Sequence, residues 1–203
     1  MSSSSYTLID LLRHGEPVGG RRYRGRRDDP LSENGWQQMR AAVGAHRPWQ
    51  SIVSSSLIRC SAFAEELATK LDIPLRTDSR LEELGFGEWE GYTADELNRL
   101  NAGQVDRFLA DPIAHRPPGA EPLAEFSARV QSAWQEICER HAGQHVLVVA
   151  HAGVIRMILS QALDIPAQRM FRIVVPSAGL SRIEIRTRSG GPVPRLLFHD
   201  GRL

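Results

Sequence analysis

Leu11-Leu12-Arg13-His14-Gly15-Glu16 begins at the end of an apolar run over residues 6–12, which is interrupted only by Thr7 and Asp10. Such a run is typical of a buried β-strand. A strand that ends in Arg-His-Gly places a guanidinium and an imidazole at the carboxyl edge of a sheet, where open α/β sheets bind their ligands. Gly15 allows the backbone to turn sharply there, or a ligand to approach it closely. This stretch therefore predicts both a central strand and a binding edge.

A second stretch repeats the pattern far along the chain. Residues 145–150, His-Val-Leu-Val-Val-Ala, run directly into His151-Ala152-Gly153. Their continuous Val and Leu content is typical of a parallel strand that is buried on both faces. Residues 154–163 then favour a helix, which Asp-Ile-Pro at 164–166 ends. Because both strands end in a histidine and a glycine, we expect His14 and His151 to meet at one edge of the sheet.

The rest of the chain alternates short strands with helices, which predicts an α/β layered fold. The length of 203 residues suits one domain over 1–203. Four prolines lie between 111 and 122, and we expect the region of about 92–122 to form a flap over the sheet edge. Further strands are expected at 51–54, 75–77, 173–175, 180–185 and 196–198, and further helices from the N-cap Ser32, after Ser54-Ser55-Ser56, and over 92–100, 104–109 and 123–141.

The composition is that of an ordinary globular protein. Hydrophobic residues make up 41%, charged residues 24%, and the formal net charge is +1, which argues against a nucleic-acid binder. No apolar run approaches membrane-spanning length, and Met1–Ser5 is a polar start without a signal segment. Cys60 and Cys138 have neither metal-ligand spacing nor a disulfide framework. We therefore expect a cytoplasmic protein without a nucleic-acid or membrane partner, and the oligomeric state, a homodimer included, stays open.

Residues 17–30 form a predicted loop that contains five arginines around Tyr23 and Gly25. One interpretation is a solvated loop whose arginines pair with Asp28 and Asp29. The other is an electropositive rim that steers anionic substrates toward the site. We expect the first for most of these arginines and the second for at least one. The five are Arg21, Arg22, Arg24, Arg26 and Arg27.

Two other segments carry candidate anion-binding and acid groups. Ser54-Ser55-Ser56 leads into a helix with Arg59 in its first turn, and a helix N-terminus with free N–H groups and hydroxyls favours anions. The loop at 80–91 has no apolar period, but its Leu and aromatic residues would hold it against the body. A carboxyl group held in such a loop near a phosphate suits a general acid.

Other polar residues are expected to be structural. Asp10 is unusual inside a core-like strand, and we expect it to be hydrogen-bonded in the interior. Glu121 is expected to cap the helix over 123–141, favourably at its positive dipole end. The remaining histidines are expected to be structural or at the surface: His46, His115, His141, His145 and His199.

Five motifs occur in order: Arg13-His14-Gly15-Glu16; Pro30-Leu31-Ser32 with Gly35 and Gln38; Ser54-Ser55-Ser56 with Arg59; Leu81-Glu82-Glu83 with 86–91; and His151-Ala152-Gly153 with Arg156. The ordered set resembles the histidine phosphatase superfamily, also called phosphoglycerate-mutase-like, from the first strand to the last. An ordered set is far more specific than any one motif. The resemblance implies a three-layer α/β/α sandwich with a mostly parallel central sheet.

The resemblance also implies a role for each matching residue. His14 matches the nucleophile that becomes phosphohistidine. Arg13, Arg59 and His151 match the rest of the phosphate pocket. Glu83 matches the proton donor, because it stands three residues before the Phe-Gly pair, and Glu82 is the second choice.

The chain departs from the family at one position of the pocket. The family usually has an asparagine six residues after the histidine, where this chain has Gly20. One phosphate contact is therefore missing or is supplied by the arginine-rich loop. Three positions complete the expected substrate-binding set, namely Gly20, Arg24 and the backbone around Ser177.

These features favour a phosphomonoester hydrolase that forms phosphohistidine and needs neither a cofactor nor a metal ion, since no carboxylates have metal-binding spacing. Its expected substrate is a small phosphorylated metabolite. The compact length, the loop 87–91 and Tyr23-Arg24-Gly25 resemble α-ribazole phosphatases and broad-specificity phosphatases, so α-ribazole 5′-phosphate is one candidate. A phosphoglycerate mutase ranks lower, because such mutases carry longer insertions. A phosphate-binding module without turnover ranks last, because the set of His, Arg and Glu residues is complete.

Overall fold

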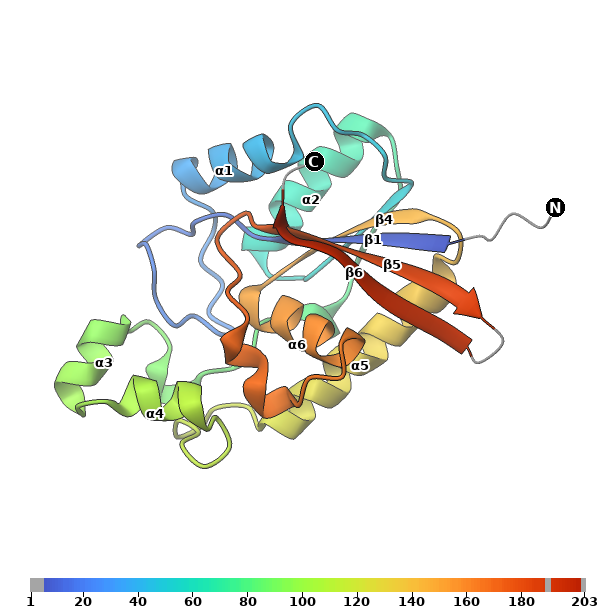
Figure 1. Ribbon diagram of the computed structural model, residues 1–203. Helices are drawn as coiled ribbons and strands as arrows, with labels where there is room; N and C mark the ends of the chain where they lie inside the picture. The colour runs from blue at the N-terminus through green and yellow to red at the C-terminus, as the bar shows by residue number, and fades with distance from the viewer. Residues whose placement is uncertain (1–5, 189–190, 202–203) are drawn as a thin grey trace.

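The computed structural model describes residues 6–188 and 191–201, and its centre is a six-stranded sheet (Figure 1). The strand order is β3-β2-β4-β1-β5-β6. The first four pair in parallel, whereas β5 and β6 are antiparallel to their neighbours. The expected mostly parallel sheet is therefore confirmed. The strands are β1 (Tyr6–Arg13), β2 (Ser51–Ser54), β3 (Leu75–Thr77), β4 (His145–Ala150), β5 (Leu180–Arg188) and β6 (Gly191–Gly201).

Helices cover both faces of this sheet, which confirms the three-layer α/β/α sandwich (Figure 1). Helices α1 (Glu33–Val43) and α2 (Ile58–Leu71) lie on one face, and α5 (Leu123–Arg140) and α6 (Ala152–Ala162) lie on the other. The short helices α3 (Ala94–Leu100) and α4 (Gln104–Ala110) stand to one side, within the region expected to form a flap. Three 3-10 turns complete the described elements, η1 (Ser79–Leu81), η2 (Gly87–Trp89) and η3 (Ala167–Arg172).

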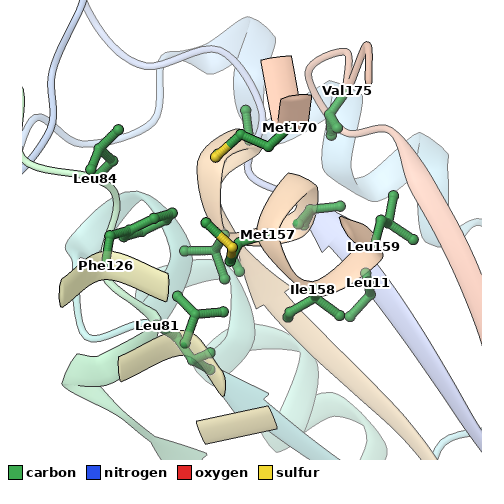
Figure 2. Packing of buried hydrophobic residues seen from close by; sticks show 14 of the residues in the cluster. Leu11, Leu81, Leu84, Phe126, Met157, Ile158, Leu159, Met170 and Val175 are labelled. Atoms are coloured by element: carbon green, nitrogen blue, oxygen red, sulfur yellow. The ribbon is translucent and has the colours of Figure 1, made fainter. Parts of the chain in front are cut away.

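The central strands are buried on both faces. Ile9 and Leu11 of β1 pack in a cluster with α5 and α6, part of which Figure 2 shows around Phe126 and Met157. Leu12 points the other way, into a cluster with α1 and α2. Successive strand residues face opposite sides of a sheet, so two apolar layers require a continuous apolar run. This is why β1 and β4 could be read directly from the sequence.

The register between β1 and β4 brings the two motifs together. Arg13 is opposite Ala150, so His14 and His151 are the next residues on neighbouring strands. The His14 amide donates to the Ala150 carbonyl at 3.0 Å, and the Ala178 amide donates to the His14 carbonyl at 3.2 Å. The backbone of His14 is therefore held from both sides.

Gly15 serves a purpose that differs from both sequence-based alternatives. A Cβ atom there would lie 2.1 Å from the carbonyl oxygen of Gly35 in α1, so Gly15 allows two protein backbones to touch. Helix α1 begins at the expected N-cap, because the Ser32 side chain accepts from the Gly35 amide. The glycine thus fixes the start of α1 against the end of β1.

The predicted strand at 173–175 is wrong. Only two late strands are present among the described residues, and they form the hairpin of β5 and β6. The carbonyls of the 173–175 segment instead accept from side chains: Ile173 from Arg156, Val174 from His199 and Val175 from Arg13. A segment whose acceptors are occupied by side chains needs no neighbouring strand.

No helix in the described ranges 6–188 and 191–201 combines the length and apolar character needed to cross a membrane.

Candidate active site

His14 and His151 form the centre of the site. Their ring centroids are 5.1 Å apart and the planes meet at 65°. The rings are buried, with exposed fractions of 6% and 0%. The expectation that two imidazoles from distant parts of the chain meet at the carboxyl edge of the sheet is met by this geometry.

Hydrogen bonding determines the tautomer of His14. Its Nδ1 lies 2.7 Å from the Gly15 carbonyl oxygen. A carbonyl can only accept, so Nδ1 carries the proton. Nε2 then holds a lone pair, and it has no hydrogen-bond partner among the described residues. This nitrogen is therefore available as a nucleophile.

His151 has the opposite tautomer. The Nε–H of Arg59 donates to its Nδ1 at 3.3 Å, and since a guanidinium only donates, the proton of neutral His151 lies on Nε2. Nε2 is 2.8 Å from the Ser55 hydroxyl oxygen, to which it donates. The two rings therefore differ: His14 has a free lone pair on Nε2 among the described residues, whereas both ring nitrogens of His151 have partners.

Both imidazoles are held in the neutral form. Burial lowers the pKa of His14 well below the usual 6.5, and the positive charges of Arg13 and Arg59 lower it further. Burial likewise lowers the pKa of His151 well below that value, with Arg59 as the next cause. A neutral imidazole is required for attack on phosphorus, because the protonated ring has no lone pair.

Arg13 is a half-buried cation, and most of its donors have no partner among the described residues. Its NH1 group donates to the Val175 carbonyl at 2.6 Å, whereas its buried Nε has no partner among the described residues. Burial lowers the pKa of Arg13 to about 10, although Glu83 acts in the opposite direction. The guanidinium therefore stays charged at neutral pH. A buried donor without a partner is uncommon in native proteins and indicates a place for a ligand.

Arg59 is also buried, with 1% of its surface exposed. Besides the bond to His151, it donates to the carbonyls of Gly25 and Arg27, each at 2.7 Å. A guanidinium has five N–H groups, so two remain for an oxyanion. Arg59 consequently ties the arginine-rich loop to the histidine pair.

Glu83 and Glu82, the two candidate acids, point to different partners. The Glu83 carboxylate accepts from the amides of Leu84 at 3.0 Å and Gly153 at 3.2 Å, which places it beside the start of α6, two residues after His151. A Cβ atom on Gly153 would lie 2.2 Å from a Glu83 carboxylate oxygen. The glycine therefore provides the space that the carboxylate occupies.

Glu82 accepts instead from the Ser56 hydroxyl at 2.6 Å. Together with the placement of Glu83, this favours Glu83 as the acid at the histidine pair.

The hydroxyls of 54–56 do not form the expected anion-binding group, because each has its own partner within the protein. Ser54 donates to the Ser55 carbonyl, Ser55 binds His151 and Ser56 binds Glu82.

The arginine-rich loop is largely an ion-paired structure, as the first interpretation expected, with the expected Asp29 as one partner and with further partners that the sequence did not indicate. Arg24 and Arg27 pair with Asp29. Asp28 instead accepts from the Ile58 amide at the start of α2. Arg22 pairs with Glu96 of α3, and Arg26 lies 3.6 Å from Glu121.

The three further substrate-binding candidates lie in different surroundings. Arg24 is buried, donates to the Val18 carbonyl at 2.7 Å, and is one of the charges that lower the pKa of His14. Gly20 has a φ of +71° and no atom within 4 Å of where a Cβ would lie. Ser177 borders a groove beside the end of α1. Their contact with substrate stays a prediction.

Two residues near the site carried no recognisable signal in the sequence. Cys60 is fully buried, with Sγ 3.6 Å from Nε2 of His151, and burial raises the pKa of this thiol, so it stays protonated. Arg129 of α5 contacts the segment that carries Glu83. Both contacts join positions far apart in the chain, which periodicity cannot reveal.

In the part of the chain that the structure describes, no three His, Cys, Asp or Glu side chains come together in a way that could hold a metal ion.

Comparison with known proteins relates this geometry to a family. The model of the histidine phosphatase superfamily (branch 1) matches residues 9–195. The "Bifunctional protein Rv2228c" of Mycobacterium tuberculosis is 36% identical over 202 residues, which are 97% of this chain and 55% of that protein. The chain thus spans about half the length of the first curated relatives it matches. The "Probable phosphoglycerate mutase GpmB" of Salmonella paratyphi C is 32% identical over 180 residues, 87% of this chain and 84% of that protein.

Solved structures agree with this relationship. A mycobacterial glucosyl-3-phosphoglycerate phosphatase in complex with VO3 has a TM-score of 0.83 and 26% identity, covering 94% of this chain and 97% of that chain. The alpha-ribazole phosphatase from Shigella flexneri has a TM-score of 0.78 and 25% identity, covering 97% of this chain and 98% of that chain. The match over residues 9–195 shows that the chain belongs to the histidine phosphatase superfamily.

Proposed function

We propose that the protein is a phosphomonoester hydrolase that transfers a phosphoryl group from a small metabolite to Nε2 of His14 and then to water. The observation that carries this proposal is the pair of buried, neutral imidazoles 5.1 Å apart, of which only His14 has a free ring nitrogen. The phosphatases among the structural neighbours support the same class of reaction.

The first step is attack of the His14 lone pair on phosphorus. A bond forms between Nε2 and phosphorus as the bond from phosphorus to the leaving oxygen breaks. Phosphoryl transfer passes through a loose transition state and depends on positioning and charge neutralisation. The unused donors of Arg13 and Arg59 supply that neutralisation, since a planar guanidinium binds phosphate oxygens in pairs. The Nε2–H of His151 donates to a third oxygen when it turns from Ser55.

Glu83 completes both steps as the proton carrier. In its protonated form it gives a proton to the departing alkoxide and becomes a carboxylate. In the second step the carboxylate takes a proton from the attacking water, and the bond between His14 and phosphorus breaks to release phosphate. The reaction needs no metal ion, because the arginines provide the positive charge.

Hydrolysis of p-nitrophenyl phosphate tests this proposal. We expect phosphate release that persists in excess EDTA and disappears in His14→Ala. Loss of activity in EDTA, restored by a divalent ion, would overturn the metal-independent reaction. A panel containing α-ribazole 5′-phosphate, glucosyl-3-phosphoglycerate and phosphoglycerate would then identify the preferred leaving group.

The likeness to "Probable phosphoglycerate mutase GpmB" favours a second candidate, a mutase of the same family. A mutase returns the phosphoryl group to its substrate and must keep water from the phosphohistidine. With 3-phosphoglycerate as substrate, conversion to 2-phosphoglycerate that outpaces phosphate release would select the mutase. Phosphate release that outpaces conversion would select the hydrolase.

A further inference from the structure

Arg129 of α5 is bound to the segment that holds Glu83, and all its donors are used. Its NH1 group donates to the carbonyls of Arg80 and Glu82, each at 2.7 Å. Its NH2 group donates to the Glu83 carbonyl at 3.0 Å. The remaining two N–H groups donate to the two carboxylate oxygens of Glu121, at 2.7 and 2.8 Å. These contacts account for all five N–H groups of a guanidinium.

Glu121 holds the other side of the same segment. Its Oε2 accepts from the Gly85 amide at 3.2 Å, while the Glu121 amide donates to the Gly85 carbonyl at 2.9 Å. The side chain therefore does not cap α5, which begins without a side-chain cap, so the expected capping role of Glu121 is wrong. Arg129 and Glu121 together bind the backbone on both sides of Glu83.

The surroundings of the pair make it rigid. The side chains of Arg129 and Glu121 are 17% and 9% exposed. The Arg129 guanidinium lies over the ring of Phe126, with 4.7 Å from its carbon to the ring centroid, and Phe126 is fully buried in the core. Rigid packing beneath a fully bonded guanidinium restricts where the backbone of residues 80–85 can move.

We propose that Arg129 and Glu121 are positioning residues for the proton carrier, holding the 80–85 backbone so that the Glu83 carboxylate lies beside the histidine pair. The inference rests on the role of Glu83 under the proposed function. Arg129 binds the backbone of the segment and not the Glu83 carboxylate, so in this proposal it acts through Glu83. Proton transfer depends steeply on the distance between donor and acceptor.

The test compares leaving groups in single turnovers, with release of the alcohol as the readout of His14 phosphorylation. p-Nitrophenolate leaves without a proton, whereas an alkoxide from β-glycerophosphate requires one. In Arg129→Lys, which keeps the charge but offers three donors in place of five, we expect a loss of about tenfold or more for the alkyl ester and less than about threefold for the aryl ester. Glu121→Gln should show the same selectivity to a smaller degree.

Two further variants make the result decisive. Arg140→Gln removes a surface ion pair with Glu136 on the same helix and should leave both rates unchanged. Glu83→Gln should show the strongest selectivity against the alkyl ester. Thermal unfolding of each variant identifies the folded samples, and Glu121→Gln replaces Arg129→Lys if the latter does not fold.

The outcomes separate this inference from the proposed function. Equal losses on both esters in the Arg129 and Glu121 variants, or no loss on either, would overturn the positioning role while Glu83→Gln stays selective. If Glu83→Gln itself lacks selectivity, the assignment of Glu83 as the proton carrier is wrong, and the positioning role is overturned with it.

Discussion

Strand β1 carries two buried polar clusters only three residues apart, and they differ in how fully their hydrogen-bonding groups are used. Asp10 is fully buried, and its carboxylate accepts four hydrogen bonds: two from Arg182 at 2.7 and 2.9 Å, one from Trp49 at 2.8 Å and one from His145 at 3.0 Å. At the end of the same strand, Arg13 has a buried Nε without a partner and His14 a free Nε2 among the described residues.

The difference distinguishes a structural cluster from a site. A carboxylate has about four lone-pair positions, so the Asp10 cluster is complete and has no place for a ligand. The His14 pocket is incomplete, since it retains donors and a lone pair that only another molecule can use. Native proteins leave few buried polar groups unpaired, and those they leave are expected at functional sites. Substitutions and pH titrations at the two clusters test this contrast, beginning with the largest expected effect.

His14→Ala should abolish phosphatase activity while the fold persists. We expect the turnover number to fall by roughly 10⁴-fold or more, the effect of removing a nucleophile in other enzymes with covalent intermediates. The free energy of unfolding should stay within about 2 kcal/mol of the wild-type value. Initial rates with p-nitrophenyl phosphate and urea denaturation measure the two quantities. If His14→Ala retains activity, the cluster around Arg13 and His14 is not the catalytic site.

Asp10→Asn should have the opposite profile. Removing one charge of a buried ion pair leaves Arg182 uncompensated and should lower the free energy of unfolding by about 3–5 kcal/mol at pH 7, with little change in the turnover number of the folded protein. Urea denaturation and active-site titration measure these two quantities. If Asp10→Asn is as stable as the wild type, the four hydrogen bonds to the Asp10 carboxylate do not stabilise the fold.

The pH dependence of this stabilisation has a definite sign. Burial alone would raise the pKa of Asp10, but the hydrogen bonds from His145 and Arg182 outweigh it, so the pKa lies below 3.8. The unfolded chain therefore takes up the proton first, and the contribution of Asp10 is present above about pH 4 and lost as the pH falls through the folded-state pKa. Wild type and Asp10→Asn should converge in stability toward that acidic limit.

His151→Ala should lie between these extremes. Under the proposed function its N–H stabilises charge on the transferring oxygens but forms no covalent bond, so we expect the turnover number to fall by about 10²- to 10³-fold, as for one lost oxyanion donor. Phosphohistidine should still form slowly in this variant, and acid-quenched samples with a ³²P-labelled substrate detect it. Complete absence of phosphoenzyme would give His151 the role assigned to His14.

The smallest expected effect concerns the two site histidines, whose protonation state should not change near neutral pH. Burial and the nearby arginines hold the pKa of both site histidines well below 6.5, so their ¹⁵N resonances should be unchanged between pH 6 and 8. Long-range ¹H–¹⁵N spectra should show the proton on Nδ1 of His14 and on Nε2 of His151. Histidine-to-glutamine variants at 14 and 151 assign the signals. Midpoints near 6.5 would contradict the neutral pair.

The lowered pKa values of His14 and His151 also determine how the free energy of unfolding depends on pH. Because the unfolded chain binds protons near pH 6.5 and the folded pocket does not, the free energy of unfolding should decrease as the pH falls below about 6.5 toward the folded-state pKa values. His14→Ala should lose part of this slope.

The local parts of this account could be predicted from the sequence. The apolar runs of β1 and β4 predicted both strands and the meeting of His14 with His151. A strand that is buried on both faces consists almost entirely of apolar residues, and such a run is easily recognised in a sequence. The Ser32 cap was also predictable, because the Gly35 amide that it accepts from is only three residues away. Where the determining partner is close in sequence, the pattern is sufficient.

The remaining parts depend on contacts between distant residues. The segment 173–175 has strand-like residues, but its carbonyls are bound by Arg13, Arg156 and His199. Arg129 is one of several arginines on an amphipathic helix, and only the fold brings it to the Glu83 segment. Side-chain partners across tens of residues follow from packing, which no local pattern encodes.

The position of the transferred phosphoryl group tests the central claim most directly. Glu83→Gln should let p-nitrophenyl phosphate phosphorylate the protein, since this leaving group needs no acid, and should then slow hydrolysis for want of a base. Mass spectrometry of the trapped protein and ³¹P NMR of its digest locate the phosphate. We predict phosphohistidine on Nε2 of His14; phosphate on Nδ1, on His151 or on neither ring would contradict the account.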